Sequence, residues 1–384
     1  MTLAFRFPGS TCLLGAVALT VAACESGEPT GAAPFPSDAG SDSAARSGSW
    51  LKGDLHAHSS HSTDALDSPV SEVIAKAEEL GFDYFSLTDH DNHVQGNITT
   101  WGDPAYRSDK MLVLYGIEWT TARGHANIFG TKPYDYAPLW ATHDTGDGAA
   151  AIAAAHAQGL FFFINHPASK DLWECGFDLD FDGMEVWNAL FAFVTSNSVA
   201  MTQWDALLMS GRRMTARGGS DSHHQKDLES TFFNIGNPTT WVYAPEKTGA
   251  AVLEGLKAGH VSVSYAPSAE RIDFTADADL DGRFETIIGD NILRGDGKRI
   301  RFKIDIVNPR PGTTYRATVL KNGAPFDSWE SEDPTLTFED TPASGERSYY
   351  RVELRGPTPD APPASAPAFG DFIALTNPIY IAFP

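Results

Sequence analysis

The residues of this sequence that could do chemistry begin with two histidines, His56 and His58, which stand two positions apart. They follow a short, largely apolar segment that starts at Leu51 and is typical of a β-strand. On a strand, residues i and i+2 point to the same face, so both imidazoles can reach one point. Neutral imidazole is the commonest metal ligand in proteins, so the pair suggests half of a metal site. Taken alone, the pair could equally be solvated or structural.

Further side chains of ligand type follow, each at the end of a predicted strand or just beyond it. They are Asp64, His90, Glu118, His125, His166, Asp221 and His223. Each one alone has an ordinary structural explanation, but together they predict one shared site. Imidazoles and carboxylates without a thiolate suit Zn, Mn or Fe. His61 and Asp64 compete for one ligand position, because both lie in the loop after His58. The other histidines are expected on the surface or beside the ligands: His93, His143, His156, His224 and His260.

The elements that must position these side chains alternate between strand and helix from residue 50 to about residue 268, as in α/β proteins. The strands predicted after the first are 84–88, 111–117, 126–129, 161–164, 184–187, 214–216, 240–243 and 261–265. The predicted helices are 68–81, 148–158, 199–209 and 249–257, the first with Ser68 as cap and Pro69 at its first position. Repeated about seven times, the pattern predicts a barrel with its chemistry at the carboxyl ends of the strands.

The sequence after residue 268 has a different period. Apolar and polar residues alternate over 300–306 and again over 350–354, which is the pattern of half-buried strands. Asn322-Gly323 is typical of a hairpin turn. We therefore predict a small antiparallel β-sandwich domain over residues 269–384.

The first residues resemble a bacterial lipoprotein signal. An apolar run from Leu13 ends at Val21-Ala-Ala-Cys24, and it is too short for a stable membrane span. We expect residues 1–23 to be removed, Cys24 to carry a lipid, and residues 24–49 to be a flexible linker. The protein would then be exported and attached to a bacterial membrane only through Cys24. The alternative is an ordinary secretory signal. In either case only Cys175 remains as a thiol, so no disulfide within the fold is expected.

The formal net charge of −22 indicates which classes of binding partner are unsuitable. A strongly acidic chain does not suit binding along nucleic acid or electrostatic adhesion to anionic membranes. We expect a small-molecule substrate and no nucleic acid.

The motifs together resemble the polymerase-and-histidinol-phosphatase (PHP) superfamily of metallohydrolases. The matching pieces are Asp54-Leu-His-Ala-His58 with Asp64, Thr88-Asp-His-Asp91, Gly116-Ile-Glu118, Gly124-His-Ala-Asn-Ile-Phe-Gly130, Asn165-His-Pro167 and Gly219-Ser-Asp-Ser-His223. The sequence is most similar to the carbaryl-hydrolase-like branch, in which a β-domain ends in a motif like Leu375-Thr-Asn-Pro-Ile-Tyr380. The resemblance implies a distorted (β/α)7 TIM-like barrel over residues 50–268 that holds two or three divalent metal ions.

The resemblance also assigns the ligands. His56, His58, Glu118 and Asp221 would hold the first metal. Glu118 would bridge to a second metal, which His125 and His166 complete. Asp64, His90 and His223 would hold a third.

Three further residues are candidates for a catalytic role: Asp91, Lys170 and Arg217. Asp91, like Asp54 and Asp89, could orient the ligand histidines. Lys170 and Arg217, together with Arg123, could clamp an anionic group, although ordinary loop charges explain them equally well.

Three functions follow from these predictions. The first is a metal-dependent phosphoesterase that acts on a small anionic ester through metal-activated water. The second is a hydrolase of carboxyl-ester, carbamate or amide bonds at the same metals. The third is a surface binding protein without turnover.

Overall fold

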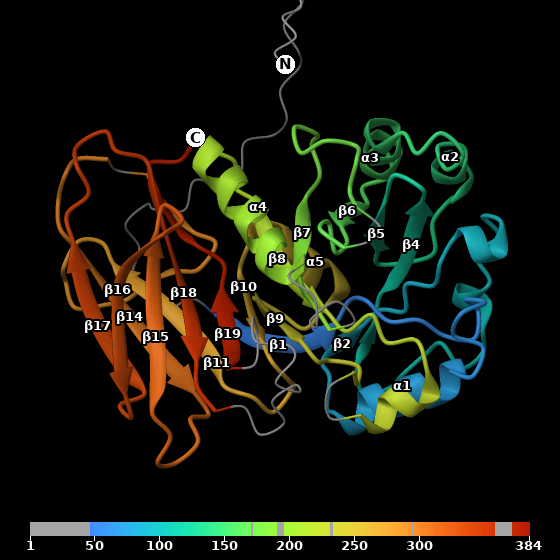
Figure 1. The fold of residues 1–384 in the computed structure, drawn as a ribbon, viewed down its shortest axis with the longest axis horizontal. Coiled ribbons are helices and arrows are strands. Elements are labelled where there is room, and N and C mark those ends of the chain that lie inside the picture. Colours follow the sequence, from blue (N-terminus) through green and yellow to red (C-terminus); the bar gives the residue numbers. More distant parts are fainter. Residues whose placement is uncertain (1–46, 170–171, 190–195, 231–232, 294, 358–370) are drawn as a thin grey trace, which may run out of the picture. The chain divides into compact units, whose positions relative to one another are not determined.

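Three β-sheets form the framework of the protein (Figure 1). The computed structural model describes residues 47–169, 172–189, 196–230, 233–293, 295–357 and 371–384. The predicted α/β class agrees with this architecture, which combines a large mixed sheet, a five-stranded sheet and an antiparallel sheet.

The five-stranded sheet carries several of the residues of interest. Its strands, in spatial order, are β4 (Tyr115–Thr121), β5 (Gly124–Gly130), β6 (Phe161–Ile164), β7 (Gly183–Asn188) and β8 (Thr215–Gly219). The β4–β5 and β5–β6 pairs are antiparallel, whereas β6–β7 and β7–β8 are parallel. The sheet is therefore mixed, unlike the all-parallel sheet of a regular barrel.

The largest sheet joins the amino-terminal strands to the carboxyl-terminal ones. Its members are β1 (Ser49–Asp54), β2 (Tyr84–Phe85), β3 (Leu112–Val113), β9 (Thr239–Ala244), β10 (Val261–Ser264), β13 (Asn291–Ile292), β15 (Tyr315–Lys321), β16 (Ala324–Ser331), β18 (Ser348–Arg355), β19 (Phe372–Thr376) and β20 (Ile379–Ile381). Strands β10 and β19 pair directly, so one sheet runs across the boundary predicted at residue 268. The domain boundaries stay a prediction.

The antiparallel sheet packs on the carboxyl-terminal part of the large sheet. Its strands are β11 (Arg271–Asp277), β12 (Thr286–Ile287), β14 (Ile300–Val307) and β17 (Thr335–Asp340). The predicted alternation appears in β14, where every second residue is buried. The rings of Phe302 of β14 and Tyr350 of β18 pack with their centroids 4.7 Å apart, and both residues belong to one apolar cluster. Burial of this shared face holds the two sheets together.

Five α-helices lie in the described residues: α1 (Val70–Glu79), α2 (Ala137–Trp140), α3 (Gly148–His156), α4 (Ser196–Ser210) and α5 (Gly249–Ala258). In α1 the buried residues recur at helical spacing, as the sequence predicted, but Pro69 occupies the cap position that was assigned to Ser68. Thr248 caps α5 by accepting a hydrogen bond from Ala251 N–H. None of these helices is long and apolar enough to cross a membrane.

Isolated bridges connect the large and the five-stranded sheets where their strands end. Ala57, after β1, bridges to Ser222, after β8, and His90, after β2, bridges to Glu118 in β4. The segment 111–117, predicted as one strand, divides at Leu114 into β3 and β4, which belong to different sheets. The strand ends of the two sheets thus meet around one point, but isolated bridges and not continuous strand pairing connect them. The closed (β/α)7 barrel therefore stays a prediction.

Candidate metal centre

His56 and His58 lie just after β1 and turn to the same side, as their spacing predicts. Their Nε2 atoms lie 3.2 and 3.1 Å from Oδ1 of Asp221, which follows β8. The side chains of both histidines are fully buried, and that of Asp221 is 4% exposed. One carboxylate oxygen between two imidazole nitrogens is an arrangement that can share a cation.

Glu118 occupies the centre of the cluster, and its side chain points inward from β4, where it is fully buried. Both carboxylate oxygens are surrounded by imidazole nitrogens. Oε1 lies 3.2 Å from His125 Nδ1 and 3.5 Å from Nε2 of both His56 and His166, while Oε2 lies 2.8 Å from His90 Nδ1 and 3.5 Å from His58 Nε2. A carboxylate that reaches five imidazoles through two oxygens can bridge two metal ions.

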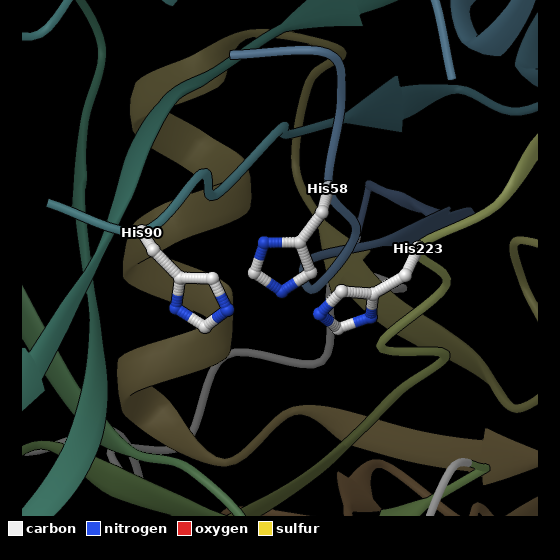
Figure 2. Close-up of side chains that lie close together, drawn as sticks. All are labelled: His58, His90 and His223. Carbon is white, nitrogen blue, oxygen red and sulfur yellow. The ribbon is translucent and has the colours of Figure 1, made fainter. Parts of the chain in front are cut away.

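On the outer side of this centre, two histidines from separate loops, His90 and His223, stack against His58. Figure 2 shows the His58 ring between those of His90 and His223, with centroid distances of 4.3 and 4.1 Å. Asp64 Oδ2 lies 3.4 Å from His90 Nε2 and 3.6 Å from His223 Nε2. The structure therefore brings all nine sequence-predicted ligands into one connected group.

Several buried polar atoms of this group make no hydrogen bond in the described structure, which indicates whether the group suits metal ions. Among the described residues, four buried side-chain atoms of the cluster make no hydrogen bond: His56 Nε2, His58 Nδ1, Glu118 Oε2 and His125 Nδ1. A buried polar atom that makes no hydrogen bond costs about 1–3 kcal/mol, and native structures rarely tolerate several together. These imidazoles and carboxylates converge without a thiolate, so they fit divalent ions such as Zn, Mn or Fe.

The electrostatics of the cluster also favour a cation. Burial and the adjacent imidazoles of His223 and His90 lower the pKa of His58 to about 3, so His58 is neutral, the form that binds metals. Burial alone would raise the pKa of Glu118, but the surrounding histidines hold that pKa well below its usual value. Burial lowers the pKa of His90, yet Glu118 and Asp64 outweigh it and raise that pKa to about 10. Carboxylates that stabilise the positive charge of a protonated imidazole in this way would also stabilise a divalent cation.

Glu185 and Asn188, on β7, fix the orientation of the inner ligands. Glu185 Oε1 lies 2.9 Å from His56 Nδ1, and its Oε2 accepts a hydrogen bond from Asn188 Nδ2 at 2.9 Å. Asn188 Nδ2 also donates to Asp221 Oδ2 at 3.1 Å. Partners of this kind set the tautomer and direction of a metal-binding histidine. The sequence motif Glu185-Val-Trp-Asn188, which resembles one of the PHP superfamily, indicates that these two side chains face the site.

Arg217 does not occupy the position expected of an anion clamp. Its side chain is fully buried, and Nη1 donates to Glu185 Oε1 at 2.9 Å while Nη2 donates to Asn165 Oδ1 at 2.5 Å. The guanidinium also lies over the Phe129 and Phe163 rings. This position does not support the predicted contact with substrate, because the guanidinium is enclosed by Glu185, Asn165 and the two phenylalanine rings. Its role is to hold Glu185 against His56.

Asp91, the second candidate catalytic residue, lies in a buried hydrogen-bond network beside β4. Asp91 is fully buried, and its two oxygens accept hydrogen bonds from Thr120 N–H at 2.9 Å and Tyr136 O–H at 2.7 Å. Burial raises the pKa of Asp91 to about 6. Asp91 therefore positions the backbone beside Glu118 and does not point at the cluster as a catalytic group would. Lys170 lies outside the described residues. Arg123 donates to the carbonyl oxygens of Gly146 and Glu174.

Of the two candidate ligands in the loop after His58, Asp64 lies at the cluster and His61 does not. His61 pairs with Asp103 at 3.0 Å and with the Thr99 hydroxyl at 2.6 Å, away from the cluster. Asp64 lies between His90 and His223, so its position favours it as the loop ligand. The sequence predicts His93 on the surface or beside the ligands, and its Nδ1 lies 3.5 Å from Oδ1 of the candidate ligand Asp64. The only signal for His93 is its spacing of three residues from His90 in a tight turn.

Backbone geometry marks the same loops. His166 and Asp221 adopt positive φ angles of 24° and 55°, which cost non-glycine residues of order 1–3 kcal/mol and cluster at functional sites. Gly219, at the end of β8, has no room for a side chain: an added Cβ would lie 2.1 Å from Glu185 Oε1 and 2.6 Å from His56 Cβ. The inner ligands can pack this closely only because residue 219 is glycine.

Comparisons with known proteins give partial similarities, and no protein-family model matches the chain. Over 132 residues it is 31% identical to a protein of Escherichia fergusonii named "Probable phosphatase YcdX", a match that covers 30% of this chain and 53% of the relative. It is 27% identical over 169 residues to the uncharacterized protein MJ1587 of Methanocaldococcus jannaschii, covering 40% of this chain and 91% of that one. The chain thus spans about half the length of the YcdX relatives.

A solved structure from Bacteroides vulgatus is also similar. It is described as a two-domain protein containing a predicted PHP-like metal-dependent phosphoesterase. It shares 18% sequence identity, covers 80% of this chain and 91% of its own, and superimposes with a TM-score of 0.43.

Proposed function

We propose that this protein is a metal-dependent phosphoesterase of PHP type. The observation that carries the proposal is the position of Glu118, whose two oxygens lie within 3.5 Å of imidazole nitrogens from five histidines. Asp221 closes the inner side of this group and Asp64 the outer side. The named phosphatase relatives agree with this chemistry.

In this proposal the side chains divide the metals between them. His56, His58 and Asp221 would hold one ion with Glu118, while His125 and His166 would complete a second. Asp64, His90 and His223 would hold a third. When bound, such ions supply an activated water nucleophile and neutralise charge on the phosphoryl oxygens. Glu185 and Asn188 keep the inner ligands in the required orientation, and burial of the inner ligands excludes bulk water.

The test combines metal analysis with substrate choice. We expect purified protein to contain about two or three divalent ions per chain and to hydrolyse aryl phosphate mono- or diesters. Asp221→Asn and His58→Ala should lose activity and at least part of the metal. Hydrolysis of aryl carboxyl esters or carbamates with no phosphate-ester hydrolysis would overturn the phosphoesterase proposal and select the alternative hydrolase. Fewer than one bound ion per chain would contradict both.

The proposed function extends to the barrel, the family branch and the substrate. We propose that the strands around the cluster form a distorted (β/α)7 barrel, that the chain belongs to the carbaryl-hydrolase-like branch, and that its substrate is a small anionic ester. The bridges from Ala57 to Ser222 and from His90 to Glu118 support the barrel. An experimental structure with a phosphate analogue bound tests the barrel and the substrate together, and a continuous ring of seven strands is the expected result.

We further propose export and lipid attachment at Cys24, on the basis of Val21-Ala-Ala-Cys24. Expression of the full chain in a bacterium should place the protein in the membrane fraction, with a lipid-modified first residue detectable by mass spectrometry. Cys24→Ala should release it from that fraction. A soluble protein that is cleaved at another position would indicate an ordinary secretory signal.

A further inference from the structure

His93 lies at the outer edge of the cluster, in the 3-10 helix Asn92–Val94 that directly follows His90. Its ring meets the His90 ring edge to face, with centroids 4.7 Å apart. His93 Nδ1 lies 3.5 Å from Asp64 Oδ1, whereas His90 and His223 approach the other oxygen of Asp64. The His93 side chain is 22% exposed. His93 therefore lies beside Asp64 at the outer edge of the cluster, where both side chains are partly open to solvent.

A backbone hydrogen bond fixes the tautomer of this ring. The N–H of Thr63 donates to His93 Nδ1 at 3.2 Å. Because Nδ1 is an acceptor, the neutral imidazole carries its proton on Nε2. Within the described part of the chain, no hydrogen bond involves His93 Nε2. The ring thus presents an available N–H donor beside the cluster.

We propose that His93 contacts the substrate and that its Nε2–H donates a hydrogen bond to an oxygen of the bound phosphate ester. This inference rests on the proposed function. A phosphate ester presents acceptor oxygens, and a partly exposed donor held by the fold at the outer edge of the cluster is complementary to them. The two arginines considered as anion clamps are engaged elsewhere, because Arg217 donates to the buried Glu185 carboxylate and Arg123 donates to loop carbonyls. The proposal therefore assigns to His93 the substrate contact that was expected of Arg217.

Two amide substitutions separate a substrate contact from a structural role. The amide of His93→Gln reaches the position of Nε2, whereas that of His93→Asn reaches only the position of Nδ1, which holds Thr63. His61→Ala is a matched control, because the His61 side chain is 21% exposed in the same region and pairs with Asp103. All variants are tested as the full metal-loaded chain with an aryl phosphate.

We expect His93→Ala to lower kcat/KM by about 10- to 100-fold, the effect of losing one hydrogen bond to a charged oxygen. Metal content and Tm should not change. His93→Gln should recover most of the loss and His93→Asn should not, while His61→Ala should behave like the unmodified protein. Recovery by His93→Asn alone would overturn the proposal, because it would assign His93 to holding Thr63. Loss of a metal ion in His93→Ala would also overturn it and make His93 a ligand.

A separate measurement distinguishes this inference from the proposed function. If the fully metal-loaded protein hydrolyses no phosphate ester, the proposed function fails. Binding of inorganic phosphate by calorimetry then tests the contact by itself. Weaker binding by His93→Ala than by His61→Ala would support the contact, and equal binding by the two variants would overturn it.

Discussion

The inner and outer parts of the metal centre are built differently. The inner layer consists of His56, His58, Glu118 and Asp221, whose side chains are at most 4% exposed. The outer layer consists of Asp64, His90 and His223, whose side chains are 45%, 9% and 15% exposed. The inner ligands lie in or next to strands, whereas Asp64 lies in a loop between β1 and α1.

The support behind the two layers differs as well. Glu185, Asn188 and Arg217 form a buried network that fixes His56 and Asp221. In the outer layer, His90 Nδ1 lies 2.7 Å from the Thr120 hydroxyl, and Asp64 remains open to solvent. Ligands that are fixed before binding lose less conformational entropy when they bind. We therefore expect the inner layer to hold metal tightly and the outer layer to exchange it readily.

Glu118→Gln should have the largest effect, because it removes a charge from the residue that joins both layers. We expect kcat to fall by about 1000-fold or more, together with loss of at least one metal ion. Steady-state kinetics and metal analysis of the same preparation test this. Asp144→Asn is the control, since the Asp144 side chain is 97% exposed and pairs with His143 at the surface. Retention of full metal content and activity in Glu118→Gln would contradict the central role of Glu118.

Glu185→Gln should weaken the inner layer alone. It removes the charge that pairs with both His56 and Arg217, while it preserves the shape of the side chain. Loss of such a supporting partner lowers metal affinity by about 10- to 100-fold. Competition with a chelating dye measures this change, and affinity at the outer layer should stay the same. Equal weakening of every ion would mean that the layers are coupled and not distinct.

Gly219→Ala should disturb the inner layer by crowding. The added methyl group would meet Glu185 Oε1 and His56 Cβ, so we expect a loss of about 1–3 kcal/mol in the free energy of unfolding, with weaker metal binding. Gly102→Ala is the matched control, because an added Cβ there meets no atom within 4 Å. Thermal unfolding of both variants tests the difference. Unchanged stability in Gly219→Ala would show that the strands can separate to make room.

Asp64→Asn should have the smallest effect and should be confined to the outer layer. We expect loss of the most easily chelated ion and about a tenfold fall in activity, with little change in Tm. Stepwise titration with a chelator, followed by Tm and activity, compares this variant with Asp221→Asn. The two layers would not be distinct if Asp64→Asn lowered Tm as much as Asp221→Asn does.

Much of the secondary structure could be read from the sequence, because local patterns decide it. The helix α1 and the strand β14 follow their apolar periods of 3.6 and 2, and β6 has the predicted bounds. The division of 111–117 into β3 and β4 could not be read, because both halves are apolar and only their different partners separate them. The residues of a strand do not show which strand, far away in the sequence, it will pair with.

The sequence by itself determined which chemistry was possible. The spacing of His56 and His58 sets both rings on one face. The nine candidate ligands are histidine, aspartate and glutamate, whose nitrogen and oxygen donor atoms suit divalent ions whatever the fold. Only the tertiary structure decided what each side chain does. Pairing of β7 with β8 places Arg217 under Glu185 as a support. The loops after β1 and β2 bring Asp64 to the cluster, leave His61 outside it, and hold His93 at its outer edge. Burial and orientation depend on contacts between residues far apart in the chain, so they arise only when the chain folds.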